Sequence, residues 1–127
     1  IFAASMPPAN VVAAHTALKV LRREPERVER LHQNAIYMRN EFRALGFQVP
    51  DDPTPIIPII IGDDLKTFRF CRRLLEEGVF VNPVISPAVP QGQQLIRSFF
   101  MATHERHHLD RVLEAFATVG REFEMIR

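Results

Sequence analysis

Residues 25–63 read PERVERLHQNAIYMRNEFRALGFQVPDDPTPIIPIIIGD, and this stretch decides the fold because its periodicity changes midway. The first half repeats apolar residues at helical spacings of three and four, namely Val28, Leu31, Ala35, Met38, Phe42 and Leu45. Gly46 then supplies a helix C-terminal cap. A turn of proline and aspartate follows, and residues 56–61 are β-branched isoleucines except for Pro58. The stretch predicts one long helix that is followed by strands.

The sequence before this stretch predicts another helix, and the sequence after it predicts further strands. Residues 10–23 have helical periodicity, with an apolar stripe of Val11, Ala14, Leu18 and Leu21. Short strands are predicted at 47–49, 56–61, 79–81 and 95–102.

Two more helices are predicted in the second half of the chain. A helix over 65–77, capped by Asp63 or Asp64, is expected to bury Leu65, Phe68, Cys71 or Arg72, and Leu75. A last helix over 105–123 is expected to bury Leu109, Val112 or Leu113, Phe116, Val119 and Phe123.

This order of elements predicts an α+β fold in which a small antiparallel or mixed sheet packs against helices. Its 127 residues are the size of one domain. Because the chain opens on Ile1 and not on methionine, we expect residues 1–127 to be a single domain from a longer protein, the C-terminal part of a two-domain enzyme according to the resemblance given below.

Composition excludes several classes of partner. Sixteen Lys and Arg balance fifteen Asp and Glu, so no basic surface for nucleic acid is indicated. The apolar runs are too short to span a membrane. Cys71 is the only cysteine, which excludes an internal disulfide and predicts a reducing, cytoplasmic location.

One metal motif occurs literally. Residues 104–108 read HERHH, which matches H-E-x-x-H and would make His104 and His108 zinc ligands with Glu105 as base. The motif requires both histidines inside one helix, whereas His104 directly follows an apolar strand. We therefore expect the start of the last helix here and no metal site, and a zinc hydrolase is kept as a third hypothesis.

Arg97 is the candidate binding residue. In the predicted strand it alternates with its neighbours, so it shares a sheet face with Leu95, Phe99 and Met101. A partly desolvated guanidinium on such a face would offer two parallel hydrogen bonds to a substrate carboxylate, although an arginine that snorkels at a sheet edge is the alternative. The stiff proline-rich loop at 82–92 would then either wall a binding site or cover the core.

Five segments, taken in order, resemble the C-terminal small domain of the α-oxoamine synthases, which are PLP-dependent enzymes of the aspartate aminotransferase fold. They are IFAASMPPA (1–9), PIIPIIIGD (55–63), EGVFVNP (77–83), PAVP (87–90), and Ile96-Arg97 followed seven residues on by His104. The family includes 8-amino-7-oxononanoate synthase, 2-amino-3-ketobutyrate CoA ligase, 5-aminolevulinate synthase and serine palmitoyltransferase.

The resemblance implies a reaction and its site residues. Members condense an amino acid with an acyl thioester, usually acyl-CoA, with loss of carbon dioxide, and they work as homodimers. Arg97 matches the arginine that binds the amino-acid carboxylate. The opening segment with Ala4 and Ser5 corresponds to one that approaches the PLP phosphate of the dimer partner. Ala3-Ala4 replace the family's Ser-Thr or Ser-Asn there, so the contact would come from backbone N–H groups or from Ser5. The family's PLP lysine lies upstream, and neither Lys19 nor Lys66 stands in a matching motif.

We therefore expect this chain to contribute substrate binding, with no catalytic residue of its own and no PLP bound to it alone. The competing hypothesis is a noncatalytic binding or regulatory domain of the same fold.

Overall fold

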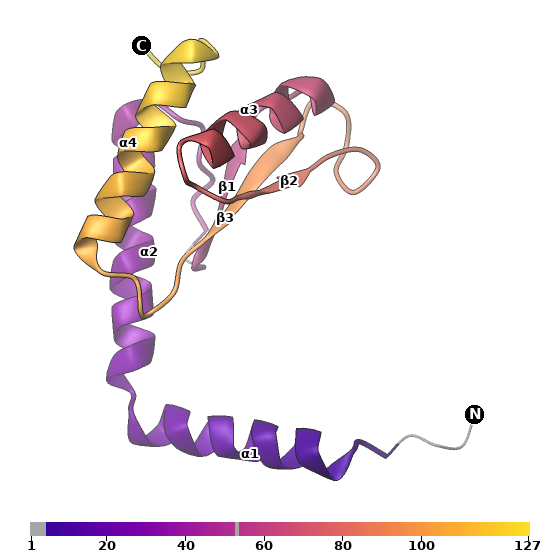
Figure 1. Cartoon of the computed structure of the whole chain (residues 1–127), viewed down its shortest axis with the longest axis vertical. Coiled ribbons are helices and arrows are strands. Elements are labelled where there is room, and N and C mark those ends of the chain that lie inside the picture. Colours follow the sequence, from indigo (N-terminus) through magenta and orange to yellow (C-terminus); the bar gives the residue numbers. More distant parts are fainter. Residues whose placement is uncertain (1–4, 53) are drawn as a thin grey trace.

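The computed structural model describes residues 5–52 and 54–127, and its helices and strands follow the predicted order (Figure 1). The elements are α1 (Pro8–Arg23), α2 (Glu26–Leu45), β1 (Ile56–Ile60), α3 (Asp64–Glu76), β2 (Asn82–Val84), β3 (Leu95–Phe99) and α4 (Arg106–Glu122). The sheet is wholly antiparallel. The predicted α+β class is confirmed, with the antiparallel alternative in place of the mixed one.

The three strands lie in the order β1-β3-β2, so β3 is central. Arg97 of β3 pairs with Pro58 on one side and with Asn82 on the other. Proline has no N–H to donate to a neighbouring strand. The two strands that contain proline, β1 and β2, are the edge strands of the sheet. The sheet thus places Arg97 in the middle of its central strand.

Helices cover one face of the sheet and bury an aromatic core. Ile57, Ile59 and Ile96 point toward them and are fully buried. Against these isoleucines lies a cluster of rings in which Phe42 of α2 and Phe116 of α4 have centroids 4.8 Å apart. Offset and edge-on ring contacts of this kind add to the energy of apolar burial. The predicted inward stripe of the last helix is confirmed at its buried residues, Leu109, Phe116 and Val119.

The long helix predicted from residues 25–46 is also confirmed. Ala35, Met38 and Phe42 of its stripe are buried in α2. Gly46 follows with a φ of 104°, a left-handed conformation that glycine adopts without strain, and its N–H closes the helix on Phe42 and Arg43 carbonyls.

The inward face predicted for α3 is wrong, although the helix and its Asp63 cap are confirmed. Leu65, Phe68 and Leu75 are exposed. The buried residues are instead Thr67, Phe70 and Leu74, which form a neighbouring stripe on the same helix. The Thr67 hydroxyl can be buried because it donates a hydrogen bond to the Asp63 carbonyl, at 2.6 Å.

Cys71 of α3 packs against the core. Its burial raises the pKa of the thiol to about 11, so the side chain is a protonated apolar group at neutral pH.

Two predicted strands are also wrong. Residues 47–49 form no strand, because the Phe47 N–H bonds back to the Phe42 carbonyl at the helix end. Residues 79–81 are likewise unpaired, since the Val79 N–H bonds to the Leu74 carbonyl, and the strand begins only at Asn82.

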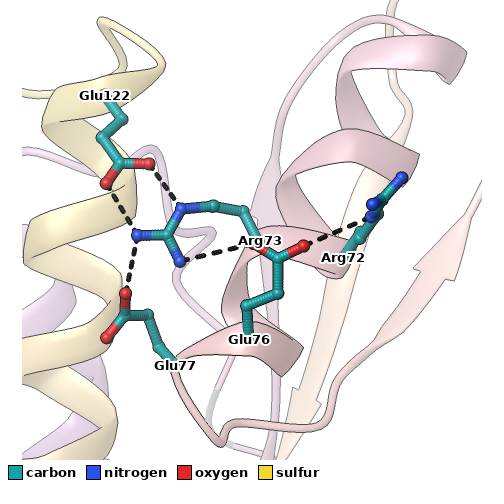
Figure 2. Close-up of polar contacts among 5 residues, drawn as sticks. All are labelled: Arg72, Arg73, Glu76, Glu77 and Glu122. Atoms are coloured by element: carbon teal, nitrogen blue, oxygen red, sulfur yellow. Dashed lines mark hydrogen bonds and ion pairs between the residues drawn. The ribbon is translucent and has the colours of Figure 1, made fainter.

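Arg73 joins α3 to α4 (Figure 2). Its guanidinium contacts Glu77, the C-cap residue of α3, at 2.6 Å and Glu122 on α4 at 2.9 Å. These two carboxylates raise the pKa of Arg73. Arg72, one residue earlier, pairs only with Glu76 on the same helix, so Arg73 alone of the two fastens one helix to the other.

Helix α1 is separate from this packed body. It projects away from the sheet in Figure 1, and none of its residues is buried. The prediction of a helix here is confirmed, but its apolar stripe, with Val11, Leu18 and Leu21, lies exposed. The stripe has no partner among the residues that the structure describes.

Candidate functional site

Arg97 lies on the open face of the sheet. Along β3, Ile96 and Ser98 face the helices and are buried, whereas Arg97 and Phe99 point the other way and are exposed. Ser98 holds the register, because its hydroxyl donates to the Ile57 carbonyl at 2.6 Å. The predicted alternation is therefore confirmed. Arg97 is exposed in this chain, and partial desolvation of its guanidinium stays a prediction.

Arg97 has no counter-charge nearby. Within residues 5–52 and 54–127 its side chain takes part in no ion pair and no side-chain hydrogen bond. Arg73 and Arg106, in contrast, are paired with carboxylates. A planar guanidinium with all its donors available can bind a carboxylate through two parallel hydrogen bonds.

A pocket of about 410 Å³ adjoins Arg97. The pairing of β2 with β3 ends at Asn82 and Arg97. Beyond that point residues 78–81 and 98–101, together with the beginning of α4, line the pocket. Its size is typical of small-molecule sites, and its walls are largely apolar.

The pocket residues that sequence reasoning missed are Phe80 and Arg111. Phe80 is exposed between two buried valines, Val79 and Val81. This alternation was visible in the sequence and places Phe80 on the opposite side from the core. Arg111 reaches the pocket only because α4 packs beside the end of β3, which no local pattern could indicate.

The histidines at the rim of the pocket form a turn and a helix cap. His104 precedes α4, and its Nδ1 accepts the Met101 N–H at 3.3 Å. His108 Nδ1 accepts the N–H of Glu105, the N-cap residue, at 3.1 Å. Burial, and then the charge of His108, lower the pKa of His104.

The zinc geometry of an H-E-x-x-H helix is therefore not formed, because His104 and Glu105 both lie before the helix. Among the described residues, no three His, Cys, Asp or Glu side chains gather as a metal site would require. The interpretation of His104 as a turn residue is supported by Asn34, whose amide donates to the Met101 and His104 carbonyls at 3.0 Å each.

The proline-rich loop does not line the Arg97 pocket. It is tied instead to the end of β1 and the start of α3. The Ser86 N–H donates to Asp64 at 3.2 Å, and the Gln94 carbonyl accepts the N–H groups of Ile61 and Gly62. None of residues 82–92 is buried or belongs to the core cluster, so neither of the two roles predicted for this loop is seen in this chain.

The residues present fit a substrate carboxylate better than they fit PLP itself. PLP enzymes hold the cofactor through a lysine. Lys19 is exposed on α1 and Lys66 lies on α3, and neither lines the pocket. Ser5 is exposed just before α1, and Ala4 lies outside the described residues.

No described helix is both long and apolar enough to cross a membrane.

Comparison with known proteins gives the same family as the sequence motifs. The pattern of the aminotransferase class I and II family matches residues 1–116. A serine palmitoyltransferase of Bacteriovorax stolpii is 43% identical over 98% of this chain and 30% of its own length. An 8-amino-7-oxononanoate synthase/2-amino-3-ketobutyrate coenzyme A ligase of Thermus thermophilus is 42% identical over 100% of this chain and 32% of its own length.

A solved structure of serine palmitoyltransferase from S. paucimobilis, with a bound PLP-myriocin aldimine, superimposes with a TM-score of 0.91 at 31% identity. The match covers 99% of this chain and 32% of that one. The chain thus spans about a third of the length of the relatives that it matches. These relatives are α-oxoamine synthases, as the resemblance predicted. By its match over residues 1–116, the chain belongs to the aminotransferase class I and II family.

Proposed function

We propose that residues 1–127 form the C-terminal small domain of a larger, PLP-dependent α-oxoamine synthase. The enzyme would join the α-carbon of an amino acid to the acyl carbon of a thioester such as acyl-CoA. The carbon–sulfur bond breaks to release the thiol, and the amino-acid carboxylate leaves as carbon dioxide, which gives an α-amino ketone. The similarity to two such enzymes, each about three times the length of this chain, supports the proposal.

Arg97 carries the proposal. It is an exposed arginine on a largely apolar sheet face where Asn82 is its paired neighbour, it has no carboxylate partner among the described side chains, and it borders a pocket of ligand size. An amino-acid carboxylate would supply the missing counter-charge and would be oriented by the two parallel hydrogen bonds. Orientation of this kind places the α-carbon for reaction and lowers the entropic part of the barrier.

PLP, when bound, supplies an electron sink for the carbanion at the amino-acid α-carbon. Because no lysine lines the pocket, we assign attachment of the cofactor to the part of the enzyme outside this chain. The described residues then act by binding and orienting the amino acid. A contact of Ser5 or Ala4 with the cofactor phosphate of a dimer partner stays a prediction, as do the homodimer and the cytoplasmic location.

The exposed apolar surfaces support a domain that packs on more protein. Leu18 and Leu21 of α1 and Phe99 and Met101 at the end of β3 are all about half exposed or more. Apolar surface of this extent is typical of sites where another domain or subunit docks. We propose that the large domain and the second subunit cover these surfaces in the complete enzyme.

The test is the intact mass of the native protein from its source, measured before and after borohydride reduction. We expect a mass about three times the 14.6 kDa of this chain, and an increment of one cofactor that becomes permanent on reduction. A native mass near 14.6 kDa with no increment would contradict the proposal and would favour a noncatalytic binding domain.

A further inference from the structure

The turn that follows β3 is held by two side chains to which the proposed function gives no role. Residues 101–104 form this turn, and the His104 N–H closes it on the Met101 carbonyl at 3.1 Å. The Asn34 amide of α2 donates to the Met101 and His104 carbonyls, at 3.0 Å each. The Met101 N–H donates to His104 Nδ1 at 3.3 Å. Both ends of the turn are therefore fastened, and we call these four hydrogen bonds the turn clamp.

The turn clamp lies at the end of β3 that the sheet holds on one side only. β2 pairs with β3 as far as Asn82 and Arg97, so beyond Arg97 the strand keeps only its pairing with β1. That pairing ends at Phe99, and the next bond, from the Phe100 N–H to the Pro55 carbonyl, is 3.4 Å long. An ordinary bond of this kind is about 2.9–3.0 Å. The sheet therefore holds this end of β3 less firmly than its middle.

The turn clamp also joins the two walls of the pocket beside Arg97. Residues 98–101 form one wall, and the beginning of α4, which starts two residues after His104, forms the other. Asn34 belongs to a third element, α2, and the neighbouring Ala35 and Met38 are buried in the core. A side chain on such a packed helix is held in place, so it gives both walls a fixed reference point.

The chemistry of the turn clamp requires these two residue types. The two carbonyls need donors, and the Asn34 amide has two N–H groups, whereas an ionised aspartate has none. The Met101 N–H needs an acceptor at Nδ1, so the neutral His104 ring carries its proton on Nε2. The Phe100 ring packs edge-on against this ring, with centroids 6.2 Å apart. The turn clamp thus fixes both the tautomer and the orientation of His104.

We propose that Asn34 and His104 are positioning residues for the Arg97 site, because the turn clamp holds the two pocket walls at the separation that lets the guanidinium meet the amino-acid carboxylate. This assignment rests on the proposed function, which supplies the carboxylate. Two parallel hydrogen bonds require the guanidinium and the carboxylate to lie in one plane, so a small displacement of the strand end costs affinity. Neither Asn34 nor His104 has to touch the substrate.

The first test measures amino-acid affinity of the complete holoenzyme by calorimetry. The probe is the standard amino acid that the wild type binds most tightly. We expect Asn34→Ala to weaken binding about tenfold, the effect of misaligning one charged hydrogen-bonded contact. Gln33→Ala is the matched control, because this amide lies one residue earlier on the same helix and donates to Glu29 at 3.2 Å. It should bind as the wild type does, and equal affinities in the two variants would overturn the assignment.

His104 variants separate positioning from direct contact with the substrate. In His104→Asn the side-chain oxygen can take the place of Nδ1 and accept the Met101 N–H, while the rest of the ring is removed. His104→Ala removes the acceptor as well. We expect His104→Ala to weaken binding as much as Asn34→Ala does, and His104→Asn to restore an affinity near that of the wild type. Equal losses in His104→Asn and His104→Ala would overturn the positioning role.

A double-mutant cycle with Arg97→Lys tests whether the turn clamp acts through Arg97. Once the paired donors of Arg97 are gone, the turn clamp has no such contact left to align. Asn34→Ala should then weaken binding by less than about twofold in the Arg97→Lys background. A full loss of about tenfold in that background, which is the additive result, would show that Asn34 acts independently of Arg97 and would overturn the assignment.

The same preparations distinguish this inference from the proposed function. A wild-type enzyme that binds an amino acid and loses affinity in Arg97→Lys, with an Asn34→Ala variant that binds normally, overturns the positioning role alone. A wild-type protein that binds neither PLP nor an amino acid overturns the proposed function and the positioning role together.

Discussion

The two faces of the sheet differ in what covers them. On the closed face, Ile57 and Ile96 are fully buried under α2, α3 and α4. On the open face, Arg97 and Phe99 are exposed, and they line a pocket together with the beginning of α4. The closed face therefore holds this domain together. We propose that the open face carries the amino-acid site, and its apolar residues are exposed in this chain.

The sharpest test of this difference exchanges one phenylalanine on each face for alanine. Phe116 is fully buried at the centre of the ring cluster, so Phe116→Ala should lower the free energy of unfolding by about 3–5 kcal/mol. Phe99→Ala, which truncates an exposed ring, should cost far less in this chain. Urea unfolding of both variants measures the difference, and equal losses would break the comparison.

A substitution that adds an atom to the core, in place of removing atoms, also tests the packing on the closed face. A Cβ at Gly120 of α4 would lie 2.6 Å from the Phe47 ring and 3.0 Å from Ile126, too close for either contact. Gly120→Ala should therefore destabilise the chain by about 1–3 kcal/mol despite the better helix propensity of alanine. The control is Thr118→Ala, an exposed position on the same helix, which should change stability little.

Tyr37 reports on the seam between α2 and α4. Its hydroxyl donates to Asp110 at 2.7 Å, and removal of this bond in Tyr37→Phe should cost about 1 kcal/mol. Burial, and then this bond, raise the pKa of Tyr37 to about 12 from 10.0. The raised pKa stabilises the fold fully below pH 10, and that contribution is lost as the pH rises toward 12.

Ultraviolet absorbance can follow this titration cleanly, because Tyr37 is the only tyrosine and the chain has no tryptophan. Asp110→Asn should bring the phenol pKa part of the way back, since burial remains. A phenol that titrates at its ordinary pKa in the folded wild type would mean that the seam is open to water.

The smallest effect is expected on α1. Leu18 is 60% exposed, so Leu18→Ala should change the unfolding free energy of this chain by less than about 0.5 kcal/mol. Calorimetric unfolding measures it, with Met38→Ala of α2, a fully buried residue, as the opposite extreme. A large loss for Leu18→Ala would show that α1 packs on the domain.

The sequence predicted best those features that local periodicity controls. The stripe of α2 was correct because its apolar residues follow a single spacing up to a glycine cap. The inward face of α3 was wrong because two apolar stripes lie side by side there, and only the ring cluster selects Phe70 and Leu74 over Phe68 and Leu75. Whether a helix face is covered depends on tertiary packing and not on its own pattern.

For the strands and the site too, features set by local sequence were predicted correctly and features set by tertiary packing were not. The alternation around Arg97 was correct because side-chain direction along a strand is local. The strand expected at 79–81 is found at 82–84, because the Val79 N–H donates a hydrogen bond to the Leu74 carbonyl at the end of α3. Arg111 joins the pocket through the packing of α4, so its place could not be predicted from local sequence.

The most direct test of the central claim, that the open face binds an amino-acid carboxylate through Arg97, is amino-acid affinity of the complete enzyme with Arg97→Lys. A lysine keeps the charge but loses the planar pair of donors, so we expect amino-acid binding to weaken about tenfold. Arg69→Lys, an exposed arginine of α3 outside the pocket, should bind as wild type does. Unchanged affinity in Arg97→Lys would remove Arg97 from the site and contradict the account.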